Sequence, residues 1–91
     1  MTTMRVVPTA PGEFGVEVEE GHQISGHKIR LPAGFLDDLL LTDVDQELIV
    51  RETFDFLLER EPHTSILPEF SLTDVSRYFP EFPDELQRRL T

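Results

Sequence analysis

Two histidines near acidic residues are the first side chains in this chain whose types and spacing suggest metal chemistry. His22 and His27 follow Glu19 and Glu20 closely, and imidazole and carboxylate groups are common ligands of divalent metals. Metal-binding histidines must be held so that their rings point at one metal ion, and each ring's other nitrogen needs a hydrogen-bond partner that fixes the ring. A turn bounded by glycines supplies neither, so we expect two solvated histidines here and no metal site.

Other candidate catalytic groups lack the partners that catalysis needs. The run His63-Thr64-Ser65 places a base beside hydroxyl groups, but a triad also needs an orienting group and an oxyanion site. The chain has no cysteine, which excludes thiolate chemistry. We therefore expect no enzymatic activity and no cofactor. Two carboxylate pairs lack a hydrophobic pocket that would separate their acidities, and these are Asp37/Asp38 and Asp43/Asp45.

The chain is small and acidic. Its 91 residues include 8 Lys and Arg against 18 Asp and Glu, a formal net charge of −10. That charge repels nucleic acids and anionic membranes, so we do not expect a nucleic-acid partner. No stretch approaches the roughly 20 apolar residues that span a bilayer, and no secretory signal is evident. We expect one cytoplasmic domain and no membrane partner.

The N-terminal third alternates as a β-hairpin does. Residues 1–12, with their prolines, are interpreted as a flexible leader. Apolar and polar side chains then alternate with period two on both sides of a turn, which predicts a hairpin over residues 13–31. We place Glu20 opposite His27, a register that sets Val18 against Ile29 on one face and acids against bases on the other.

The remainder of the chain has the spacing of short helices. Thr42 or Asp43 is expected to cap the second of them, and Pro62 to end it. Ser71 and Asp74 have the spacing of a capping box. The predicted helices cover residues 32–41, 43–60, 71–79 and 83–90.

The helix predicted over residues 43–60 is apolar around much of its circumference. With successive residues about 100° apart, Arg51, Glu52, Asp55 and Glu59 share one side, and the remaining arc is about 200° wide. A helix lying on one sheet needs only about 100° of apolar surface. Either the C-terminal segment folds over this arc, or a second copy of the chain covers it.

The segment from His27 to Pro32, followed by two predicted helices, resembles the ribbon–helix–helix regulators, a group that includes antitoxins. In those proteins a strand of alternating polar residues enters the major groove of DNA, which implies DNA contacts by Lys28 and Arg30. The first helix is short here, and the usual glycine-containing turn between helices is missing. A DNA-binding regulator is therefore our alternative function.

A second resemblance covers most of the chain, from the hairpin to Glu81. The strings Phe56-Leu-Leu-Glu-Arg-Glu-Pro62, Ser65-Ile-Leu67 and Tyr78-Phe-Pro-Glu81 are similar to those of an uncharacterised family of small acidic bacterial proteins. This resemblance implies a bacterial origin and a stable fold. It implies no substrate, because we know no established activity for that family.

Together these patterns predict an α+β fold, an N-terminal β-hairpin packed on a long central helix with short flanking helices. We expect a non-enzymatic protein-interaction module whose partner is a second copy of itself, a homodimer. Aromatic side chains are favoured anchors at such interfaces. The candidate interface residues are Phe54, Phe56, Leu58, Tyr78, Phe79 and Phe82.

Overall fold

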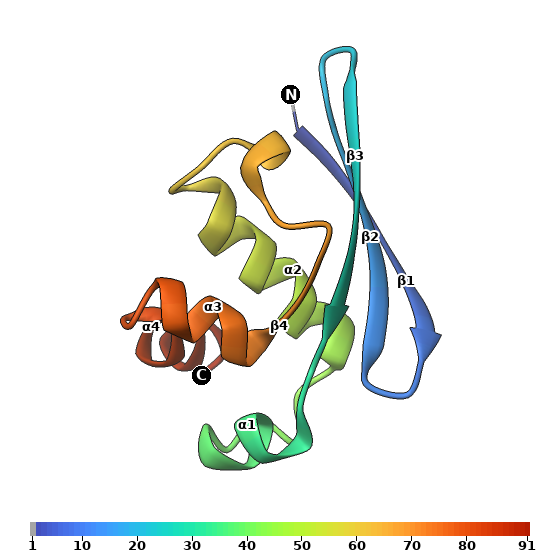
Figure 1. The fold of residues 1–91 in the computed structure, drawn as a ribbon. Coiled ribbons are helices and arrows are strands. Elements are labelled where there is room, and N and C mark those ends of the chain that lie inside the picture. Colours follow the sequence, from blue (N-terminus) through green and yellow to red (C-terminus); the bar gives the residue numbers. More distant parts are fainter. Residues whose placement is uncertain (1) are drawn as a thin grey trace.

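A four-stranded sheet carries all the helices on one of its sides (Figure 1). The computed structural model describes residues 2–91, and the fold is α+β. The strands are β1 (Thr2–Ala10), β2 (Glu13–Glu20), β3 (Gln23–Arg30) and β4 (Glu69–Ser71). The helices are α1 (Ala33–Asp38), α2 (Gln46–Leu58), α3 (Leu72–Tyr78) and α4 (Phe82–Leu90), with a 3-10 turn, η1 (His63–Ser65).

The sheet has the strand order β1-β2-β3-β4, and its first three strands form an antiparallel meander. Gly12 and Gly21 adopt φ values of 70° and 63° in the two turns, a conformation that costs glycine little. β4 pairs in parallel with the end of β3, where Ile29 lies opposite Phe70. The mixed sheet is therefore a local meander completed by one distant short strand.

Strand alternation divides the sheet into an inner face under the helices and an outer face without them. Phe14, Val16 and Val18 of β2 are buried on the inner face, together with Ile29 of β3 and Val6 of β1. The residues between them point away from the helices. The core thus lies between the inner face and the helical layer (Figure 1).

The predicted flexible leader is wrong, because residues 2–10 form the strand β1 along β2. Met4 and Val6 point inward at period two and contribute to the core. Pro8 is tolerated because β1 is an edge strand, where a missing backbone N–H breaks no ladder bond if it faces outward. The N-terminal element is therefore a three-stranded meander and not only a hairpin.

The predicted hairpin register is also wrong, although the faces are right. Glu20 lies opposite Gln23 instead of His27, a shift of four residues. The turn consists of Gly21 and His22 alone, because glycine at the first central position permits a two-residue hairpin turn. An even shift keeps every side chain on its predicted face.

The predicted helices exist, but their bounds differ. α2 starts after Asp45, whose carboxylate accepts a hydrogen bond from the Glu47 amide at 3.0 Å. The predicted caps Thr42 and Asp43 lie in the turn before α2. α2 has 13 residues and is shorter than the helix predicted over 43–60, so residues 2–91 contain no single long central helix. The capping box of Ser71 and Asp74 at α3 is confirmed. Among residues 2–91 no helix is long and apolar enough to cross a membrane.

The broad apolar arc of α2 is covered within one chain. On the sheet side, the Phe54 ring lies 5.6 Å from His27 and 5.8 Å from Phe70 between centroids. On the opposite side, Phe56 lies 5.7 Å from Phe79 and 5.0 Å from Phe82. The arc therefore gives no reason to invoke a second copy on α2.

β1 forms one edge of the sheet, with β4 at the other, and α2 partly shields β1. The Arg51 guanidinium donates a long hydrogen bond, 3.4 Å, to the Met4 carbonyl. That carbonyl therefore points away from β2, towards the edge. Pro8 has the same parity as Met4, so its nitrogen, which carries no proton, faces the same edge.

Candidate functional site

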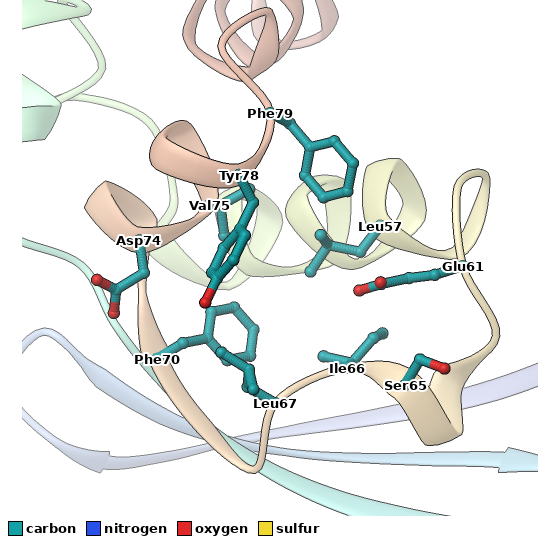
Figure 2. A pocket seen from close by; sticks show the side chains of 10 residues that line it. All are labelled: Leu57, Glu61, Ser65, Ile66, Leu67, Phe70, Asp74, Val75, Tyr78 and Phe79. Carbon is teal, nitrogen blue, oxygen red and sulfur yellow. The ribbon is translucent and has the colours of Figure 1, made fainter.

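An apolar groove of about 190 Å³ opens between the end of α2, the segment from η1 to β4, and α3 (Figure 2). Its size suits one ring-sized group, since an engineered cavity of about 150 Å³ holds benzene. Leu57, Ile66, Phe70, Val75 and Phe79 supply most of its walls. The remaining lining residues are Glu61, Ser65, Leu67, Asp74 and Tyr78.

Three local features of the sequence create the groove. Pro62 follows the end of α2, and the chain turns through η1 into an extended segment that leads to β4. Ile66 of this segment is buried, whereas its neighbour Leu67 is 45% exposed. The capping box of Ser71 and Asp74 then starts α3 immediately after β4. Residues 62–68, which we call the strap, therefore run past the N-terminal end of α3 and leave the groove between the strap and α3 open.

The strap is fastened to β3 by a buried polar relay. Ser25 Oγ lies 2.8 Å from His27 Nε2 and 2.7 Å from His63 Nδ1. His27 Nδ1 lies 2.8 Å from the Leu67 carbonyl, and the Lys28 amide donates to the Pro68 carbonyl at 2.8 Å. One serine thus joins two histidines from elements far apart in the chain.

The Leu67 carbonyl at one end of the relay decides which atom donates in each of its hydrogen bonds. A carbonyl only accepts, so His27 carries its proton on Nδ1, and in an uncharged ring Nε2 accepts from Ser25. Ser25 in turn accepts from His63 Nδ1. His63 Nε2 is then left buried without a partner among residues 2–91. The relay positions the strap, and the groove does not reach Ser25.

One carboxylate points into the groove. In Figure 2 the Glu61 side chain extends between Leu57 and Ile66. Glu61 is half-buried, and it forms no ion pair within residues 2–91. Asp74 differs, because its carboxylate accepts from the Ser71 amide at 3.0 Å. The groove therefore combines apolar walls with one unpaired negative charge.

The six candidate interface residues do not share one surface. Phe54, Phe56 and Phe82 are fully buried in the core, so their prediction as surface anchors is wrong. Tyr78 and Phe79 both line the groove, and Tyr78 is largely exposed. Leu58 is half-buried and faces a separate shallow depression near Met4. Two of the six residues thus belong to the groove, and no sequence pattern had indicated Glu61 or Leu67 as groove residues.

The residues proposed for DNA and metal contacts are also placed. Lys28 and Arg30 lie on the outer face of β3, and Arg30 donates to Glu69 at 2.8 Å. His27 points inward and both of its ring nitrogens are engaged, while His22 lies in the exposed turn. Residues 2–91 contain no group of three or more His, Asp or Glu side chains that could hold a metal ion.

A charged cluster holds α4 against α2. Arg89 donates two hydrogen bonds of 2.8 Å to the Glu59 carboxylate and one of 3.2 Å to Glu85. The hydrogen bonds from Arg89 hold the pKa of Glu59 below its usual range, and Glu59 raises the pKa of Arg89. This cluster lies outside the groove, and its role is to hold the two helices together.

No family model, curated protein or solved structure matches the chain.

Proposed function

We propose that this protein is a non-enzymatic interaction module, and that its groove binds an apolar side chain of a partner protein next to a lysine or arginine. The observation that carries the proposal is the unpaired Glu61 carboxylate directed into an apolar groove (Figure 2). A cation that arrives with an apolar group would pair with this half-buried carboxylate and fill the groove at once.

The charge of the whole chain supports a basic partner. A protein with a net charge of −10 attracts cationic segments and speeds their encounter. A second copy carries the same charge and would be repelled from this groove. The exposed Leu67 and Tyr78 at the groove mouth give the partner apolar and aromatic contact area.

The groove contains its own reporter. The chain has one tyrosine and no tryptophan, so tyrosine fluorescence comes from Tyr78 at the groove. We suggest titrating blocked tripeptides with a central leucine or serine and two flanking lysines or glutamates. The Lys-Leu-Lys peptide is expected to give a saturable change, with an affinity at least about 10-fold above that of either the Glu-Leu-Glu or the Lys-Ser-Lys peptide.

Variants separate the groove from general attraction. Leu67→Arg should abolish the saturable change, whereas Leu48→Arg is a matched control because Leu48 is 44% exposed on α2, outside the groove. Glu61→Gln should remove the preference for lysine over glutamate flanks and keep the preference for leucine. Equal responses to all three peptides, or equal effects of the two arginine variants, would refute the proposal.

A further inference from the structure

The outer face of the sheet contains two glycines that the fold does not require. Gly15 and Gly26 lie within β2 and β3, and neither has a positive φ. A Cβ at Gly26 would meet nothing within 4 Å, and one at Gly15 would make an ordinary contact with Thr9. Glycine weakens a strand interior and often marks the close approach of another surface. Within residues 2–91 no other segment packs closely on Gly26, so the fold itself supplies no such surface there.

The outer face is also the part of the molecule where charge is nearly balanced. It carries Arg5, Lys28 and Arg30 against Glu13, Glu17, Glu19 and Glu69, three bases and four acids, with a balance of −1. The remainder of the chain has five bases and fourteen acids, with a balance of −9. A second copy therefore meets less repulsion here than over the rest of the surface.

The arrangement of these charges is self-complementary. Glu13, Glu17 and Glu19 lie along β2, and Lys28 and Arg30 lie along β3. Glu69 lies on β4 and accepts a hydrogen bond from Arg30. The sheet pairs Gly15 with Lys28, and Gly26 with Glu17. If two outer faces stack about a two-fold axis parallel to the strands and between β2 and β3, each copy's β2 lies over the other's β3. The same pairs then face each other between copies, so each glycine leaves room for a long charged side chain.

We propose that two copies of this protein associate through the outer faces of their sheets, with β2 of one copy over β3 of the other. Val7 and Ile24, which are 49% and 61% exposed, become covered at the margins of the contact. In the part of the chain that the structure describes, no helix lies over this face (Figure 1). This proposal does not depend on the groove, which lies in the helical layer on the opposite side of the sheet.

The expected dimer is weak. Three strands of eight or nine residues cover roughly 400 Å² in plan at ordinary strand spacing. A standard interface buries about 800 Å² on each partner. Sedimentation velocity should therefore extend from 10 µM to 1 mM, at physiological salt. The wild-type protein should shift from the 10.5 kDa monomer towards twice that mass within this range.

Charge exchange tests the register. The double variants K28E/R30E and E13K/E17K should each weaken the dimer at least about 100-fold, and mixing them should restore a heterodimer. R77E/R88E is the matched control for the first, because it changes the net charge equally on exposed helical side chains. It should change the dissociation constant by less than about 3-fold.

Gly26→Val gives a readout that a folding defect cannot imitate. Valine suits a strand and has open space there, so the monomer should become more stable in thermal unfolding while the dimer is lost. Leu67→Arg in the groove should leave association unchanged. The proposal is overturned by a wild-type monomer at 1 mM, by a dimer insensitive to Gly26→Val, by equal effects of K28E/R30E and R77E/R88E, or by double variants that fail to associate when mixed.

Discussion

Removal of the Ser25 hydroxyl tests the relay that fastens the strap. In Ser25→Ala, His27 Nε2 loses a donor at 2.8 Å and His63 Nδ1 loses an acceptor at 2.7 Å. An unsatisfied buried polar atom costs about 1–3 kcal/mol. Ser25 is half-buried and water can partly compensate, so we take the lower end for each atom. The expected loss is about 2 kcal/mol of unfolding free energy, or roughly 10 °C in melting temperature for a domain of this size.

Urea denaturation followed by circular dichroism measures this loss directly. Ser25→Thr is the matched control, because it keeps a hydroxyl and suits a strand, and it should stay near wild-type stability. Hydrogen exchange adds a local test, since the Lys28 amide donates to Pro68 of the strap and should exchange faster in Ser25→Ala. A loss below about 0.5 kcal/mol with unchanged exchange at Lys28 would show that the relay does not hold the strap.

Three further changes probe other parts of the fold. Leu40 has φ 60° after α1 and is 81% exposed; a side chain there costs about 1 kcal/mol, so Leu40→Gly should stabilise the protein by about that amount in urea denaturation, whereas Leu40→Ala should not. Ser71→Ala removes half of a capping box and should cost about 1 kcal/mol in the same assay. Arg89 lowers the pKa of Glu59 in the folded state, so at acidic pH the unfolded chain binds more protons and this contribution, present at neutral pH, is lost as the pH falls through the titration range of Glu59. Glu59→Gln should therefore flatten the fall in melting temperature between pH 6 and pH 3, and an unchanged slope would contradict this assignment.

Local patterns in the sequence predict faces and caps better than pairings. The alternation of Phe14, Val16 and Val18 correctly predicted the inner face, and Ser71 correctly predicted a cap. The hairpin register depended on the turn length, which Gly21 decides by its positive φ. The strand β1 was missed because Pro8 and the following Pro11 suggested a flexible leader, although Met4 and Val6 have the period of a strand.

The groove could not be predicted because its walls come from three separate elements. Tyr78 and Phe79 were identified as aromatic surface candidates, but the strap and α2 that complete the groove meet them only through tertiary packing. Glu61 follows α2 in an acidic sequence and looks like any solvated helix-end residue. The relay was equally hidden, since Ser25 and His63 are 38 positions apart in the chain.

The contact between Arg51 and Met4 has a consequence for solubility. A long outermost strand offers unpaired backbone groups to any other extended chain, which is a route to fibrils. Here a cation occupies one acceptor of β1 and Pro8 removes one donor four residues later. An incoming strand would meet an obstacle at both points. Both features disfavour the addition of another strand along β1.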